Sequence, residues 1–208
     1  MATKLGVFND ALLILTQGVL DNPDPSPSNE RSRVLNANWV PAVEACLERA
    51  DWDFAEERAQ LARVTPAPAF GFSYYYGLPT DCLRVTFVSE TGIEGDDLLN
   101  YKIEKGKIAT DAETLYLKYV SSTAISYPGR WSSNFARYVS AELAFRSLKL
   151  NSSAEERAKK ELKEAKSDAV GVDAVQNPPT FRKPGQWVQA ARTGRRGTID
   201  GGPTSSFN

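Results

Sequence analysis

The sequence predicts a mainly α-helical fold, in the form of a four-helix bundle with an inserted small β-domain and an extended C-terminal arm. Apolar residues recur at spacings of three and four, typical of helices with one buried face, in four segments: 4–20, 30–50, 132–145 and 155–170. Between them lie short stretches rich in β-branched and aromatic residues. We expect four regions: the first half of the helical bundle with an aromatic loop (1–82), a β-rich insertion (83–122), the second half of the helical bundle (123–171) and the extended C-terminal arm (172–208).

The first two expected helices precede the aromatic loop. The first, over 4–20, ends before the segment 21–29, where prolines remove backbone donors and polar residues favour turns. The second, over 30–50, contains Pro41. Because proline lacks an N–H group, it implies either a kink or a new helix start capped by Asn38, and we favour the kink.

The region between Trp52 and Val85 contains many aromatic residues between glycines and prolines. Because each ring can bury a large apolar area, we expect a loop folded back over the core. Trp52 and Phe54, two positions apart after a helix, are expected to anchor it against the bundle. The structural aromatic residues of this loop are expected to be Trp52, Phe54, Phe70, Phe72, Tyr74 and Tyr76.

Short strands are expected in the insertion, and they cover 83–88, 98–103, 107–110 and 114–120. Two of them are joined by Glu104-Lys105-Gly106-Lys107, where the glycine can adopt a positive φ angle. The sequence therefore predicts a β-hairpin at this position.

Two more helices are expected after the insertion. The third begins after Trp131-Ser132, and the fourth follows Ser152-Ser153-Ala154-Glu155, which has the pattern of a capping box. Gly171 offers this fourth helix a stop. The fourth helix is highly charged, which favours a solvated helix and leaves an exposed subunit interface as the alternative. Its thin apolar stripe consists of Ala158, Leu162, Ala165 and Ala169.

The C-terminal arm has no regular spacing and contains repeated proline and glycine, so it is not expected to form a packed domain. Aromatic and arginine side chains in such a segment are typical of interface hot spots, and we expect the arm to order on a partner. Nucleic-acid binding by the same residues is the weaker alternative. The expected partner-binding residues are Phe181, Arg182, Lys183, Trp187, Val188, Arg192, Arg195 and Arg196.

Composition argues against an enzyme. The chain contains no histidine, which removes the usual general base and the commonest metal ligand. The sequence has no phosphate loop, dinucleotide fingerprint or nucleophile elbow. Three acid pairs are expected in surface and turn positions: Asp51/Asp53, Glu56/Glu57 and Asp96/Asp97. We therefore expect no catalytic activity, no cofactor and no bound metal.

Charge and cysteine content set further limits. A net charge of −1 gives no global reason to expect binding to nucleic acid or to an anionic membrane. Cys46 and Cys82 lack the spacing of a metal site or a disulfide framework, so we expect two buried free thiols. The apolar run 11–15 is too short for a membrane span and lacks the flanks of a secretory signal. We expect a soluble protein made in the cytoplasm.

Two stretches resemble a known family. They are Trp52-Asp53-Phe54-Ala55 and the run that leads from Phe70-Gly71-Phe72-Ser73-Tyr74 to Leu78-Pro79-Thr80-Asp81-Cys82-Leu83-Arg84-Val85. With their flanking segments, they make residues 5–170 similar to the podophage tail tubular protein A, or head-to-tail adaptor (connector), family and its prophage relatives. None of these motifs is a catalytic signature.

The resemblance implies a bacteriophage virion protein made in the host cytoplasm. On this interpretation, copies form a dodecameric ring at the head–tail interface, between the portal protein and the tail nozzle or another tail protein. Double-stranded DNA passes through the channel during genome ejection without sequence-specific contact. The resemblance also implies a helical bundle with an inserted β-domain and terminal extensions that reach neighbours.

Position in the chain suggests which region contacts which partner. We expect the arm to dock on the portal and the β insertion to contact the tail nozzle or a neighbouring subunit. The principal alternative is a monomeric DNA-packaging or regulatory nucleic-acid-binding module. A carboxylate-dependent hydrolase comes third.

Overall fold

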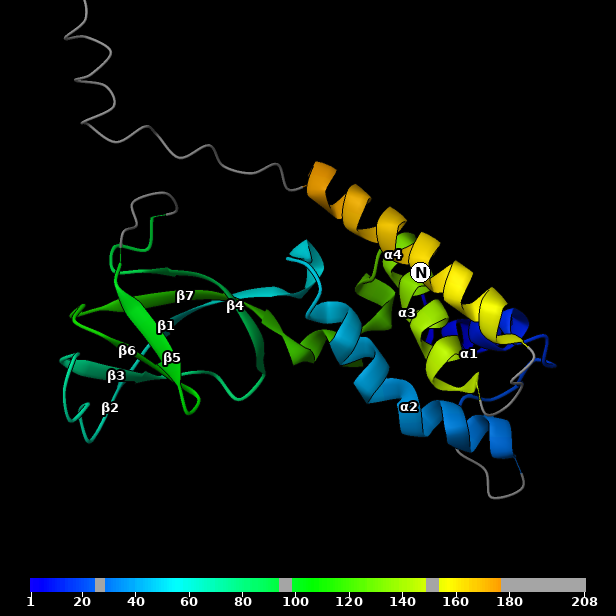
Figure 1. Cartoon of the computed structure of the whole chain (residues 1–208), viewed down its shortest axis with the longest axis horizontal. Helices are drawn as coiled ribbons and strands as arrows, with labels where there is room; N and C mark the ends of the chain where they lie inside the picture. Colours follow the sequence, from blue (N-terminus) through cyan, green and yellow to red (C-terminus); the bar gives the residue numbers. More distant parts are fainter. Residues whose placement is uncertain (25–28, 94–98, 149–153, 177–208) are drawn as a thin grey trace, which may run out of the picture.

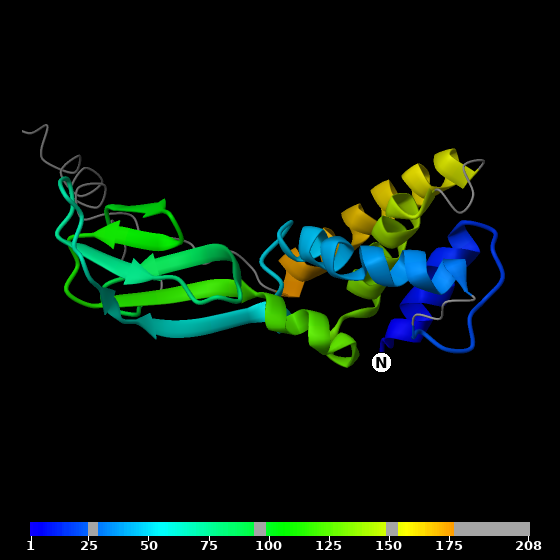
Figure 2. The ribbon, with the colours of Figure 1, turned by 90° about the horizontal axis from the view of Figure 1, so that it is seen from below.

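The computed structural model describes residues 1–24, 29–93, 99–148 and 154–176, which form a helical lobe and a β lobe (Figure 1). The two lobes lie end to end, so the described portion of the molecule is elongated (Figure 2). The β lobe is inserted between the second and third helices. Each lobe has its own hydrophobic core.

The described portion of the helical lobe contains α1 (Lys4–Ile14), α2 (Glu30–Leu47), α3 (Ser133–Arg146) and α4 (Glu155–Gln176). Helix α3 is central, because it contacts each of the other three. Three helices begin with a side-chain cap, in which Thr3, Asn29 and Ser132 accept a hydrogen bond from a backbone N–H of the first turn of α1, α2 and α3. Short 3₁₀ helices lie at the junction of the lobes: η1 (Asp53–Ala55), η2 (Ser122–Ser126) and η3 (Pro128–Arg130).

The described strands form two antiparallel sheets. They are β1 (Glu56–Leu61), β2 (Arg63–Val64), β3 (Tyr74–Gly77), β4 (Cys82–Ser89), β5 (Tyr101–Glu104), β6 (Lys107–Thr110) and β7 (Leu115–Ser121). The three-stranded sheet has the order β1-β7-β4, and the four-stranded sheet has the order β2-β3-β6-β5. Side chains from both sheets, including Tyr76, Ile108 and Leu117, pack together in the core of the β lobe.

The predicted fold class is wrong. The protein is a mixed α/β fold with two antiparallel sheets, not a mainly α four-helix bundle. The sequence predicted strands only from Leu83, whereas the region expected to be an aromatic loop contains β1, β2 and β3. Strand β1, Glu-Glu-Arg-Ala-Gln-Leu, consists mostly of residues with weak strand preference. Its pairing with β7, from Glu56 opposite Val120 to Leu61 opposite Leu115, imposes the extended conformation.

Helix α1 ends at Ile14, before the predicted end at residue 20. Thr16 adopts a left-handed φ of 56°. Its N–H bonds to the carbonyl of Leu13 at 3.0 Å, and the N–H of Gln17 bonds to that of Leu12 at 2.8 Å. These two bonds satisfy the last carbonyls of the helix and terminate it there.

The predicted end of the fourth helix is also wrong, and the less favoured interpretation of Pro41 is excluded. Helix α2 runs through Pro41, so no new helix starts at Asn38, whose side-chain amide instead donates to the Val34 carbonyl at 2.9 Å. Helix α4 continues past Gly171 to Gln176, because a glycine costs only about 1 kcal/mol relative to alanine inside a helix. The serines of the expected capping box lie outside the described residues.

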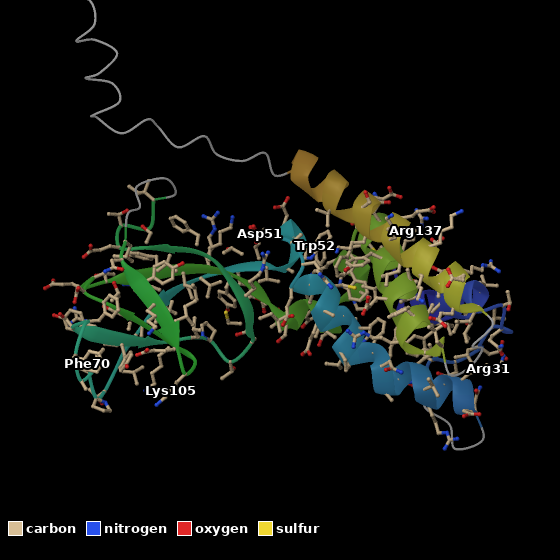
Figure 3. The ribbon with its side chains drawn as sticks, in the orientation of Figure 1. Arg31, Asp51, Trp52, Phe70, Lys105 and Arg137 are labelled. Atoms are coloured by element: carbon tan, nitrogen blue, oxygen red, sulfur yellow. The ribbon has the colours of Figure 1, made fainter. Side chains whose placement is uncertain are left out.

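The apolar stripe of α4 faces its own lobe. Its alanines are buried, Ala165 and Ala169 within the core of the helical lobe, and Leu162 is half-buried against that core. Arg137 of α3 forms ion pairs with Glu161 at 2.8 Å and with Asp168 at 2.9 Å (Figure 3). The alternative of an exposed subunit interface along this stripe is therefore wrong.

The predicted hairpin is confirmed. Strands β5 and β6 pair antiparallel, with Glu104 opposite Lys107. Lys105 and Gly106 form the turn with φ values of 51° and 70°. Two consecutive left-handed residues match the twist of a two-residue hairpin.

Candidate docking site

Trp52, one of the two expected aromatic anchors, lies where the two lobes meet (Figure 3). Trp52 is buried, and its indole Nε1 donates a hydrogen bond to the Cys46 carbonyl at 3.0 Å. The rings of Trp52 and Phe54 each meet the ring of Phe135 with centroids 4.8 Å apart. These contacts fix the chain between the end of α2 and the start of β1.

A series of ring contacts continues from this point through the helical lobe. Phe135 meets Trp131 at a centroid distance of 5.1 Å, and Trp131 stacks on Trp39 at 5.7 Å. Trp39 then meets Phe8 of α1 at 5.5 Å. The rings therefore connect α1, α2 and α3 to the junction and have a structural role.

The other expected aromatic residues belong to the β lobe and differ in exposure. Tyr76 is buried, and its hydroxyl donates to the Ala112 carbonyl at 2.8 Å. Tyr74 is half-buried, with the guanidinium of Arg63 3.9 Å from its ring centroid. Phe72 is half-buried, whereas Phe70 is 90% exposed. Trp52 and Phe54 thus pack in the core of the helical lobe and Tyr74 and Tyr76 in the core of the β lobe, whereas Phe72 is only half-buried and Phe70 is exposed.

Phe70 lies in the segment 65–73 between β2 and β3, which we call the tip loop. Figure 3 shows it at the end of the β lobe that is farthest from the helices. The base of the loop is fixed, because the N–H and Oγ of Ser73 both donate to the Asp111 carboxylate at 2.8 Å. Arg63 adds a hydrogen bond to the Glu113 carbonyl at 2.6 Å. The tip loop therefore presents a large apolar side chain to solvent from an anchored base.

The three-stranded sheet has a hollow of about 190 Å³ on the face turned away from the core of the β lobe. Strand pairing places Arg58 opposite Lys118 and Gln60 opposite Tyr116, and it brings Phe87 of β4 opposite Lys118. Aromatic and aliphatic carbons supply most of its lining, with cationic groups beside them. We call it the outer hollow and define it by Arg58, Gln60, Phe87, Gly92, Tyr116 and Lys118.

Sequence analysis did not identify the outer hollow. On β7, Tyr116 and Lys118 alternate with the buried residues Leu115 and Leu117, and this period of two indicates that they share a face. The hollow also needs β1, which had not been predicted as a strand. The missing signal was therefore the partner strand.

A polar cluster lies at the inner end of the β lobe. Asp81 accepts a hydrogen bond from Ser121 Oγ at 2.5 Å, and Glu57 accepts one from Thr123 Oγ1 at 2.8 Å. The Tyr119 hydroxyl lies 3.3 Å from an oxygen of each carboxylate. Burial raises the pKa of Tyr119, and the charges of Asp81 and Glu57 raise it further. The phenol therefore stays protonated, and the cluster holds β1, β4 and β7 together.

The acid pairs noted in the sequence make separate contacts where they are described. Glu56 forms an ion pair with Lys118 at 2.8 Å on the outer face of β1, whereas Glu57 belongs to the polar cluster. Asp51 forms an ion pair with Arg84 of β4. These carboxylates link elements of the fold, which is a structural use of charge.

Both cysteines are free, as predicted. Cys46 is buried, but Cys82 is only half-buried, so the expectation of burial holds for the first alone. Burial raises the pKa of both thiols, and nearby acidic charge adds to the increase. Neither thiol is placed as a ready nucleophile.

Several predicted positions lie outside the described residues: Asp96, Asp97 and the arm residues Phe181, Arg182, Lys183, Trp187, Val188, Arg192, Arg195 and Arg196. Among the residues that the structure does describe, no three or more carboxylate, thiol or imidazole side chains gather in a way that would hold a metal ion. None of the described helices is long and apolar enough to cross a bilayer.

Two features of the described β lobe are the strongest candidates for contact with another macromolecule. One is the exposed phenyl group of the tip loop, and the other is the outer hollow. No protein-family model matches the chain, and no curated protein matches its sequence. The role of the candidate site must therefore be inferred from its own residues.

Proposed function

We propose that this chain is a virion structural protein, a head-to-tail adaptor whose copies form a ring between the portal and the tail of a bacteriophage. The ring leaves a channel for genome ejection. The resemblance of the run from Trp52 to Val85 to the adaptor family supports this proposal. We assign the arm to portal docking, and the β lobe to contact with the tail nozzle or a neighbouring subunit.

The observation that carries the proposal is the exposed apolar end of an elongated subunit. Phe70 exposes 90% of its surface at the far end of the β lobe. Aromatic side chains are enriched at protein interfaces, and exposing one on an anchored loop is costly unless a partner covers it. A ring subunit held between two larger assemblies has that requirement.

The use of charged groups agrees with a structural role. Glu56, Asp51 and Glu161 each pair with a cation from a different element of the fold. Asp81 is occupied by the hydroxyl of Ser121. These acids stabilise the junction and the lobes, which supports a structural role for the chain.

The test is co-sedimentation of the purified chain with portal rings from the same virus, followed by electron microscopy of the pellet. We expect the chain to sediment with the portal and to add a ring of density to one of its faces. The alternative function, nucleic-acid binding, is tested by measuring DNA binding over a range of salt concentrations. Failure to bind the portal, together with salt-dependent DNA binding by a monomer, would replace the adaptor by the nucleic-acid-binding module.

A further inference from the structure

We infer that Phe70 of one copy inserts into the outer hollow of a second copy, which makes a head-to-tail contact between neighbouring subunits. The inference rests on the proposed function, because it names the side chains by which adjacent subunits of the ring meet. It gives a role to the most exposed aromatic side chain of the described residues and to the hollow on the opposite sheet.

The volumes agree. The outer hollow measures about 190 Å³. An apolar cavity of about 150 Å³ is large enough to take up benzene, so the hollow has room for the phenyl group of Phe70. Gly92 keeps one side open, because a Cβ there would lie 3.3 Å from the Tyr116 ring and its φ of 76° disfavours a side chain.

The lining of the hollow suits an aromatic ring. Phe87 and Tyr116 supply ring faces and edges, and aromatic pairs in offset or edge-to-face contact gain stability beyond the area that they bury. Arg58 and Lys118 place cationic groups beside the same space. Lys118 is paired with Glu56, and a phenyl ring in the hollow would gain a cation–π contact with the exposed Arg58 side chain.

The tip loop is built to present its side chain. Pro66 and Pro68 restrict the backbone before Phe70, and Gly71 follows with a φ of 87°. The two hydrogen bonds from Ser73 to Asp111 close the base of the loop. A group held in place before binding loses less entropy when it docks.

Charge complementarity favours a second copy as the occupant. The exposed residues Asp111 and Glu113 lie beside Arg63 at the base of the tip loop, and the two acids and one cation give this base a net negative charge. Arg58, an exposed cation, lies at the outer hollow. When the phenyl group enters the hollow of another molecule, the acidic base of the loop approaches that basic rim, and opposite charges fix the orientation.

The geometry also selects the type of contact. Because Phe70 is 90% exposed, it does not fill the hollow of its own chain. The tip loop and the outer hollow are different surfaces, so their contact is heterologous, and each subunit keeps one of each for the next neighbour. Repeated heterologous contacts form a ring when the rotation between neighbours closes, as the proposed function requires, whereas an isologous contact stops at a dimer.

The experiment uses two complementary full-length variants. Phe70→Ala removes the phenyl group and keeps the hollow, and Gln60→Trp fills the hollow and keeps the phenyl group. Sedimentation velocity at up to about 1 mM protein reports weak association. We expect wild type to associate with rising concentration and each variant alone to associate at least about tenfold more weakly. Tyr127→Ala, which removes an exposed ring from the helical side of the junction, is the matched control and should behave as wild type.

Mixing the two variants gives the decisive readout. The phenyl group of the Gln60→Trp chain can enter the hollow of the Phe70→Ala chain, and no further contact remains, so we expect dimers and no larger species. The Phe70→Ala chain labelled with ¹⁵N should show shifted amide resonances at Gln60, Gly92 and Tyr116 when unlabelled wild type is added. This second readout needs no change in the hollow, so it stands even where Gln60→Trp does not fold.

Three results would overturn the inference: equal association of wild type and Phe70→Ala, no dimer in the mixture of folded variants, or amide shifts confined to residues away from the outer hollow. Binding of Phe70 to a tail protein alone, with the chain monomeric at every concentration, would also overturn it in favour of a different partner. No portal is present in these measurements. Their failure therefore leaves portal binding unaffected, and failure of portal binding leaves these results unchanged.

Discussion

The indole Nε1 of Trp52 donates a hydrogen bond across 3.0 Å to the carbonyl oxygen of Cys46, and this bond ties the chain that leaves α2 back onto the last turn of that helix. The same indole packs on the ring of Phe135 in α3. One side chain therefore joins two helices to the entry of the β lobe.

Replacing Trp52 by alanine should destabilise the protein by about 3–5 kcal/mol, because a large cavity opens between α2 and α3. Trp52→Phe keeps a ring against Phe135 and loses the hydrogen bond, so it should cost less, with about 1 kcal/mol from that bond. Chemical denaturation measures both. Phe70→Ala is the control and should leave the midpoint unchanged, since that ring is exposed. An unaltered midpoint for Trp52→Ala would exclude the anchoring role.

Replacing Asp81 by alanine should destabilise the β lobe by about 1–3 kcal/mol, because the buried Ser121 hydroxyl loses its carboxylate acceptor. Glu113→Ala is the matched control at an exposed carboxylate of the β lobe, and it should change stability by about 0.5 kcal/mol or less. Denaturation gives the two differences, and hydrogen exchange at the Ser122 amide, which bonds to the Asp81 carbonyl, locates the effect. Equal losses in both variants would show that the polar cluster does not fix the junction.

Stability should fall as the pH rises above 10. Burial raises the pKa of Tyr119 and of Tyr138 above the ordinary value of 10.0. The unfolded chain releases these protons near pH 10, whereas the folded chain keeps them. The contribution of the two protonated phenols to stability is therefore complete below pH 10 and is lost as the pH rises above it. Urea denaturation at a series of alkaline pH values should show a smaller loss per pH unit in Tyr119→Phe and Tyr138→Phe. Tyr127→Phe, at an exposed ring, should match wild type.

A chain that ends at Gln176 should keep its helices, because α4 is complete at that residue. It should fail to sediment with portal rings if the arm carries the attachment. Within the full chain, Trp187→Ala should weaken portal binding by about 2 kcal/mol or more, the usual loss at an interface hot spot. Normal incorporation of the shortened chain would move the attachment to the helical or β lobe.

At micromolar concentration the purified chain should be monomeric, and the ring should form on the portal. Burial of one phenyl side chain gives about 2–3 kcal/mol. Association itself costs about 4 kcal/mol or more, so the phenyl group alone cannot hold neighbours together. The ring and charge contacts beside it bring the affinity only into the millimolar range, and at lower concentrations the portal must hold the neighbours together. Sedimentation velocity measures the state directly. Stable rings of the purified protein at that concentration would disprove assembly on the portal.

The elements that could be predicted from the sequence carry their signals within a few residues. Ser132 caps α3 by accepting a hydrogen bond from the Phe135 N–H at 3.2 Å, and both residues stand in the stretch that predicts the helix. Lys105 and Gly106 likewise both adopt the positive φ angle that a two-residue hairpin turn requires. Such signals do not depend on the rest of the fold.

The elements that could not be predicted depend on distant partners. Strand β1 contains residues that favour helices, and it is extended because β7 pairs with it. Phe70 and Tyr76 belong to one aromatic run, yet they are 90% and 1% exposed, since Tyr76 is covered by the core of the β lobe. The outer hollow requires the register of three strands at once. No local pattern contains that information.

The chain enters the β lobe at Glu56 and leaves it beside the partner position Val120, so the lobe is attached to the helices by two adjacent antiparallel strands. An insertion whose ends are neighbours can be exchanged as a cassette, because the flanking helices need no new connection. Recombination between related genes at these two points would transfer the tip loop and the outer hollow together. The two surfaces would then be inherited as a matched pair, and a new specificity between neighbours would arise in one step.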